Sequence, residues 1–144
     1  MIQQFQQSML KLNFKKVYVL KKGIEMAKLI ETPSIVKSSG NMKKVIREHV
    51  GLVNSNNNEI SIAHMTSPKG WEEAGQAPEF HEYTLVLEGE LTVRTIEKTF
   101  NVKAGQSIIT YPGEWVKYET KRKGANYIAI CLPAFSHEKV NRDE

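Results

Sequence analysis

The sequence predicts an all-β domain, and two observations carry this prediction. Clusters of Gly, Pro, Asn and Ser recur at close intervals, as at 38–41, 54–58, 67–70 and 121–124, and such clusters mark turns. Between them lie short runs rich in Val, Ile, Thr and Tyr, the residues that strands favour. Short strands at this spacing are typical of a sandwich or a small barrel.

The runs place the strands in order along the chain. We expect them over 43–53, 59–66, 83–87, 91–96, 99–102, 107–110, 116–120 and 127–132. Turns separate them, including one at 88–90.

The strand around 82–87 has two apolar faces, because alternate side chains point to opposite sides of a strand. One side carries Glu82, Thr84 and Val86, and the other carries Tyr83, Leu85 and Leu87. We therefore expect both sides to be covered, one by the barrel interior and the other by N-terminal strands or a partner subunit. This pattern motivates a homodimer hypothesis.

Length and composition limit the class of protein. The chain has 144 residues, of which 40% are hydrophobic and 25% charged, as in an ordinary globular domain. No stretch approaches the roughly 18 apolar residues of a membrane helix, so we expect no membrane partner. Cys131 is the only cysteine, which excludes an internal disulfide and a CxxC motif. We expect a cytoplasmic protein.

The basic charge is concentrated at the N-terminus. The formal net charge is +4, and residues 1–25 hold five lysines against the single acid Glu25. No basic helix or RNA-binding aromatic motif accompanies it, so we expect no nucleic-acid partner. We interpret 1–25 as a basic extension and hypothesise that it is a non-native leader, with Met26 as the initiator. Residues 26–137 would form the barrel and 138–144 a polar C-terminal tail.

Residues 70–113 resemble the cupins, small jelly-roll-like β-barrels of two antiparallel sheets. The family's first motif is G-x5-H-x-H-x3-E-x6-G, and Gly70, Gln76, Pro78, Glu82 and Gly89 fit its spacing without a gap. The stretch YTLVLEGEL at 83–91 looks like the family's strand and turn. In the second motif, G-x5-P-x-G-x2-H-x3-N, both glycines match at positions 105 and 113. The whole looks like bacterial cupins of unassigned function, distantly similar to the ethanolamine-utilisation cupins.

The departures from these motifs bear on metal chemistry. Cupin metal sites use three His and one Glu, but the His positions here hold Gln76, Pro78 and Val116, and only Glu82 remains. One carboxylate and one amide do not make a tight site for Fe, Ni, Cu or Zn. The resemblance thus implies the fold, and we expect no metal cofactor. If a divalent metal is bound, His64, Gln76 and Glu82 are the conceivable ligands, with His64 facing the interior; His81 and Glu82 are adjacent and should face opposite sides.

Glu82 is the candidate functional residue, because a carboxylate inside an apolar barrel needs a partner. His64, Arg47, Tyr118 or a bound ligand could serve. Aromatic residues at the presumed barrel mouth are candidates for lining an apolar ligand site, or alternatively for closing the barrel or filling a dimer interface. The candidate ligand-binding set is Gln76, Glu82, Trp71, Phe80, Tyr111, Trp115 and Tyr118.

Two function classes follow. The first is a small-molecule-binding protein without a metal, acting beside a metabolic enzyme. The alternative is a small isomerase or epimerase with acid–base chemistry at Glu82, with or without an atypical metal site. The enzyme requires a second titratable group within hydrogen-bond reach of Glu82, and a Glu82 satisfied only by backbone or Tyr groups would count against it. A purely structural protein would have its interior filled by side chains.

Overall fold

The computed structural model describes residues 26–144, and it confirms the all-β prediction. The strands are β1 (Ser34–Val36), β2 (Val45–Val50), β3 (Ser61–Ser67), β4 (His81–Thr95), β5 (Thr99–Lys103), β6 (Ser107–Thr110), β7 (Val116–Glu119) and β8 (Ala125–Leu132), followed by the 3₁₀ turn η1 (His137–Lys139). The expectations for residues 1–25 lie outside the described part of the chain. Between residues 26 and 144, no helix is long and apolar enough to cross a membrane.

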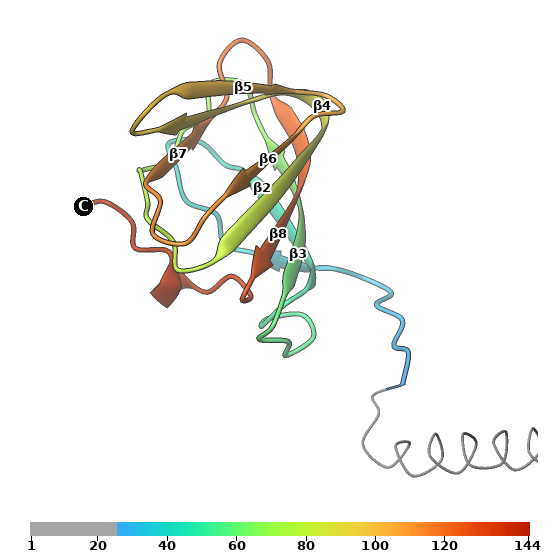
Figure 1. Cartoon of the computed structure of the whole chain (residues 1–144). Helices are drawn as coiled ribbons and strands as arrows, with labels where there is room; N and C mark the ends of the chain where they lie inside the picture. The colour runs from blue at the N-terminus through green and yellow to red at the C-terminus, as the bar shows by residue number, and fades with distance from the viewer. Residues whose placement is uncertain (1–25) are drawn as a thin grey trace, which may run out of the picture.

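All strand pairs are antiparallel, and the order is β1-β2-β3-β8-β4-β5, with β6 and β7 also pairing with β4. The first half of β4 lies between β6 and β8. Its second half lies between β5 and β7. Figure 1 shows β4 turning at one corner of the barrel and continuing beside β5. This one strand therefore joins the two sheets.

The turn expected at 88–90 is wrong, since β4 runs unbroken for 15 residues. The register against β8 shifts between Val86 and Glu88, which marks a bulge. Gly89 lies in this bend with φ +76°, and a Cβ built on it would fall 1.9 Å from the carbonyl oxygen of Gly124. A glycine thus bends the strand instead of ending it.

The core follows the period-two alternation of the strands. Along β8, Ala125, Tyr127, Ala129 and Cys131 are buried, while the residues between them are more exposed. The largest apolar cluster includes the fully buried Trp71, Val86, Leu91, Val93 and Val116. A second cluster forms around Phe80, Cys131, Phe135 and Val140.

The barrel does not end at residue 137, because residues 138–144 pack against it. Val140 is 1% exposed and belongs to the second core cluster. The Asn141 carbonyl accepts from the Ala77 amide at 3.1 Å, and the Asp143 amide donates to the Gly75 carbonyl at 2.8 Å. The polar composition of this segment concealed its single apolar anchor, Val140, through which it packs on the barrel.

Candidate functional site

A cavity of about 50 Å³ lies inside the barrel, between β2, β3, β4, β8 and the C-terminal segment. Much of its wall is apolar, including Ala63, Phe80 and Ala129. Its polar lining includes Lys44, Glu73, Gln76, Glu82, Tyr118 and Arg142. A few polar groups on an apolar wall are typical of a ligand site.

Glu82 faces this cavity from β4, where its strand neighbours are Thr110 of β6 and Cys131 of β8. Its Oε2 accepts a hydrogen bond from the Tyr118 hydroxyl at 2.9 Å. The Tyr118 hydroxyl also lies 3.2 Å from Oγ1 of Thr110. Alternation places all three groups on the inner face, so the local strand pattern alone builds this chain of hydrogen bonds.

Burial controls the protonation of this pair. It raises the pKa of the Glu82 carboxyl from 4.5 to about 6, and the hydrogen bond from Tyr118 only partly opposes the change. Burial and the nearby Glu82 hold the pKa of Tyr118 well above its ordinary value. Near neutral pH, Tyr118 is therefore a stable donor and Glu82 an acceptor that titrates close by.

A second polar cluster centres on Glu73. Its Oε2 lies 3.6 Å from Nζ of Lys44 and 3.3 Å from a guanidinium nitrogen of Arg142. The Ser39 hydroxyl donates to the same oxygen at 3.2 Å. Arg142 also donates to Oε1 of Gln76 at 3.0 Å. Two cations and the carboxylates of Glu73 and Glu82 thus meet in one small cavity.

Glu48 also lines the cavity but serves the fold. Its Oε1 accepts from the amides of Val53 and Asn54 at 2.9 and 2.8 Å. These bonds close the loop after β2, so its carboxylate is already satisfied.

Solved structures of known proteins show the same architecture, although no family model matches the chain. A putative ethanolamine utilization protein Q from Salmonella typhimurium LT2 superposes with a TM-score of 0.57, at 18% identity over 75% of this chain and 100% of that one. An RmlC-like cupin from Shewanella frigidimarina reaches 0.60, at 21% identity over 77% and 93%. The polyketide cyclase RemF of Streptomyces resistomycificus also reaches 0.60, at 13% identity over 81% and 89%.

This chain has the cupin fold. At these identities the likeness fixes the fold and leaves the chemistry of the cavity to its own residues. In sequence, this chain is 38% identical over 101 residues to the endoribonuclease YbeY of Myxococcus xanthus strain DK1622. That match covers 69% of this chain and 34% of the relative, so the chain spans about a third of the relative's length.

The candidate ligand-binding residues divide into two groups in this structure. Gln76, Phe80, Glu82 and Tyr118 all line the cavity. Trp71, Trp115 and Tyr111 do not belong to its wall.

Each of those three aromatic residues has another place. Trp71 is fully buried in the core, and its Nε1 donates to the Ser39 carbonyl at 3.2 Å. Trp115 lies partly exposed and donates from Nε1 to Asp143 at 2.9 Å. Tyr111 is 57% exposed and packs edge-on against His81 outside the barrel. Trp71 therefore belongs to the core, and Trp115 contacts the C-terminal segment.

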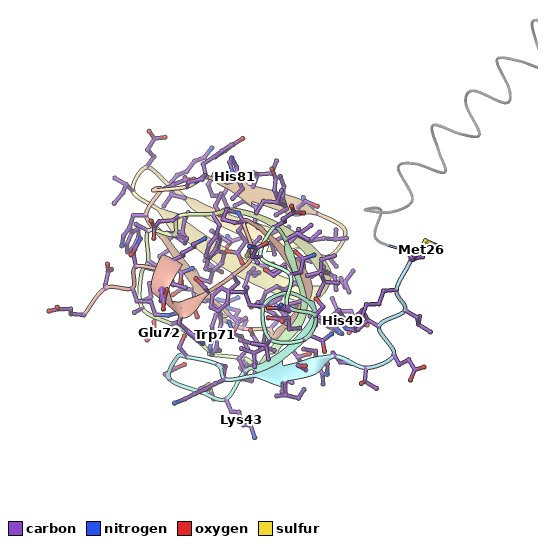
Figure 2. All side chains as sticks on the ribbon, turned by 90° about the horizontal axis from the view of Figure 1, so that it is seen from below. Met26, Lys43, His49, Trp71, Glu72 and His81 are labelled. Carbon is purple, nitrogen blue, oxygen red and sulfur yellow. The ribbon has the colours of Figure 1, made fainter. Side chains whose placement is uncertain are left out.

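The histidines do not gather at Glu82. His64 hydrogen-bonds Asn126 on the outer side of β3 and β8, because the inward positions of β3 are Ser61, Ala63, Met65 and Ser67. The conceivable trio of His64, Gln76 and Glu82 therefore cannot meet on one ion. His81 stacks on Tyr83, on the face opposite to Glu82. Figure 2 shows His49 and His81 at separate places on the barrel.

The metal site that a cupin fold implies does not fit these residues. Val116 lies in the apolar core with 0% exposure, and Pro78 is buried without a donor. The remaining amide oxygen, Gln76 Oε1, is engaged by Arg142. Within residues 26–144, no group of three His, Cys, Asp or Glu side chains could hold a metal ion. The cation beside Gln76 is the Arg142 side chain.

Sequence reasoning missed Lys44, Glu73 and Arg142. Lys44 had a usable signal, because it shares the alternation of the inward-facing Ile46 and Glu48. Glu73 lies in a loop and Arg142 near the chain end, so no local pattern pointed to either.

Proposed function

We propose that this cupin barrel binds a small polar molecule in its cavity without a three-histidine metal site. The observation that carries the proposal is the convergence of Glu82, Tyr118, Lys44 and Arg142 on one cavity with apolar walls. Glu82 hydrogen-bonds a hydroxyl and has no ion-pair partner among the described residues. A buried carboxylate in this state is stabilised by a ligand that donates to it.

The volume limits the ligand. Pockets for drug-sized molecules measure about 300–1,000 Å³, whereas this cavity measures about 50 Å³. It accommodates a molecule of a few heavy atoms. The space supports a ligand site over a purely structural barrel with a filled interior.

The direct test is a ligand-observed NMR screen of small acids, aldehydes, amines and polyols against the wild-type protein. We expect a binder whose affinity falls by about tenfold or more in Glu82→Gln, because a charge-assisted hydrogen bond is lost. Glu88→Gln is the matched control, since Glu88 is an exposed carboxylate on the same strand. A screen without binders, or a binder indifferent to Glu82→Gln, contradicts the proposal.

The geometry favours binding over the acid–base alternative. That alternative requires a second titratable group within hydrogen-bond reach of Glu82. Across residues 26–144, the side chain bonded to Glu82 is Tyr118, whose raised pKa keeps it protonated. A Glu82 carboxylate whose hydrogen-bond partner is a tyrosine hydroxyl counts against acid–base catalysis and favours a binding site.

The ribonuclease activity named for the Myxococcus relative is not part of this proposal. About two thirds of that protein lies outside the match. A cavity of about 50 Å³ also leaves no room for a nucleotide unit of an RNA chain.

The single cysteine, Cys131, is buried, and we propose a cytoplasmic location because the chain has no cysteine pair for a disulfide.

We further propose a homodimer through the outer face of β4 and β6. Tyr83, Leu85 and Ile109 are 39%, 41% and 47% exposed there. Tyr83 lies opposite Ile109 on β6, and Ile128 of β8 flanks Leu85. Contiguous exposed apolar patches mark interaction sites. An uncharged patch suits a second copy of itself, because a two-fold axis places it against its own image without like-charge repulsion.

A further inference from the structure

Lys44 is a buried amine on the wall of the proposed ligand cavity. It directly precedes β2, and its residue is 7% exposed. Its Nζ lies 4.2 Å from the centre of the Trp71 ring. Lysine is rarely buried to this degree, and reversible binding of a polar molecule does not by itself require an amine at this position.

The neighbours of Lys44 provide too little negative charge to stabilise its ammonium form fully. Its ion pair with Glu73 is long, at 3.6 Å. The same carboxylate oxygen also serves Arg142 at 3.3 Å and the Ser39 hydroxyl at 3.2 Å. One oxygen is thus divided among two cations and a hydroxyl.

This environment favours the neutral amine. Burial lowers the pKa of the Lys44 ammonium, and the attraction of Glu73 and then Glu82 opposes the change without cancelling it. Repulsion from Arg142 lowers the pKa further. A desolvated lysine beside a second cation is the arrangement in which lysine becomes a nucleophile.

From the buried position of Lys44 on the cavity wall beside Arg142, and from Glu82 in the same cavity, we infer that Lys44 Nζ forms an imine with a small carbonyl compound, an aldehyde or a 2-oxo acid of about two or three carbons. This inference rests on the proposed function, because the cavity must admit the ligand. The volume of about 50 Å³ sets the size limit.

The cavity holds the groups that imine formation needs, an amine and a group that transfers protons. The lone pair of Nζ attacks the carbonyl carbon, so an N–C bond forms and the carbonyl oxygen takes the π electrons and a proton. Nitrogen loses a proton to give a carbinolamine. The hydroxyl then takes a second proton, the nitrogen lone pair forms the C=N bond as the C–O bond breaks, water leaves, and a protonated imine remains. Glu82, which lines the same cavity, is the group that can give and take protons near neutral pH.

The test is reductive trapping on the folded wild-type protein. The protein is incubated at pH 7 with acetaldehyde or glyoxylate and sodium cyanoborohydride, and the modified lysines are mapped by peptide mass spectrometry. Burial lowers the pKa of Lys44, so a larger fraction of its side chain is the free amine at pH 7 than for an exposed lysine. We therefore expect Lys44 to be labelled before the exposed lysines and to carry most of the adduct at low conversion. Labelling by acetaldehyde alone identifies an uncharged aldehyde, and labelling by glyoxylate alone identifies a 2-oxo acid held by Arg142.

Lys43 is an internal control for this experiment. It is the neighbouring residue, it is exposed, and Figure 2 shows it pointing away from the barrel. Lys43→Arg should leave the preferential adduct intact, whereas Lys44→Arg keeps a long basic side chain and removes the adduct. Labelling spread over the exposed lysines with Lys44 unmodified overturns the inference, whether or not the variants fold.

The failure of the imine and the failure of the binding proposal give different results. A cavity that binds ligands reversibly in the NMR screen but leaves no adduct on Lys44 refutes the imine alone. A cavity that binds nothing and traps nothing refutes both.

Discussion

Glu82 shows how the surroundings of a side chain determine its chemistry. Its carboxylate occupies the Glu position of the cupin motif, but its partner is the Tyr118 hydroxyl at 2.9 Å. Arg142 supplies positive charge to the same cavity, and Lys44 supplies an amine, both from outside the two motifs. Glu82 therefore faces basic side chains of the protein, and the three motif positions for histidine hold Gln76, Pro78 and Val116.

The raised pKa of Glu82 makes stability depend on pH. Its pKa is about 6 in the folded state and 4.5 as the ordinary value. The folded state thus binds this proton more tightly, so its stabilising contribution is present below pH 4.5 and lost as pH rises through 6. The difference corresponds to about 2 kcal/mol. We expect Glu82→Gln to gain about this much over wild type between pH 4 and 8.

Urea unfolding of both proteins across this pH range measures the effect. Comparison with Glu88→Gln removes the contribution of an ordinary exposed carboxylate. A stability difference that stays constant with pH would show that burial does not perturb Glu82.

The donor set predicts weak metal binding. Gln76 and Glu82 are the two motif positions that retain an oxygen donor, and Gln76 is already bonded to Arg142. We expect no near-stoichiometric Fe, Mn, Ni, Cu or Zn after incubation and desalting, as measured by mass spectrometry of the metals. Stoichiometric metal that disappears in Glu82→Ala would refute this expectation.

At the scale of the element, β4 depends on Gly89. Its φ of +76° and the carbonyl of Gly124, 1.9 Å from a built Cβ, both exclude a side chain. We expect Gly89→Ala to cost at least about 3 kcal/mol of stability, well beyond the roughly 1–2 kcal/mol of a left-handed backbone alone.

Gly105→Ala is the matched control for Gly89→Ala. Gly105 has φ +83°, but nothing lies within 4 Å of its built Cβ. The stability lost in Gly105→Ala should therefore be limited to the roughly 1–2 kcal/mol that a left-handed backbone costs. Chemical denaturation of the two variants compares them, and equal losses would show that Gly89 is not a point of close approach.

The same element shows what the sequence could predict. Alternation correctly placed Glu82, Thr84 and Val86 on one face, because that pattern is local. It could not show that β4 continues past residue 88, since Glu-Gly-Glu is compatible with both a turn and a bulge. Arg142 was beyond local reasoning, because its place depends on the pairing of the C-terminal segment with residues 75–79.

The whole molecule has two contrasting surfaces on one sheet. The inner face of β4, β6 and β8 carries Glu82, Thr110 and Cys131 toward the cavity. The outer face presents the apolar patch around Tyr83, Leu85 and Ile109. A sheet that separates a polar cavity from an exposed apolar face needs a cover on its outside. Between residues 26 and 144 no strand covers Leu85, which is 41% exposed.

This exposure predicts the oligomeric state. We expect the wild-type protein to have twice the monomer mass of 16.4 kDa in light scattering coupled to gel filtration.

Leu85→Glu should be monomeric, because a buried interface cannot accommodate an unpaired carboxylate. Ile96→Glu should remain dimeric, since Ile96 is 80% exposed and lies between β4 and β5, away from the patch. A monomeric wild type, or equal loss of the dimer in both variants, would place the contact elsewhere or exclude it. Because both positions are exposed, thermal unfolding should show that both variants fold, so a change in mass reports association and not stability.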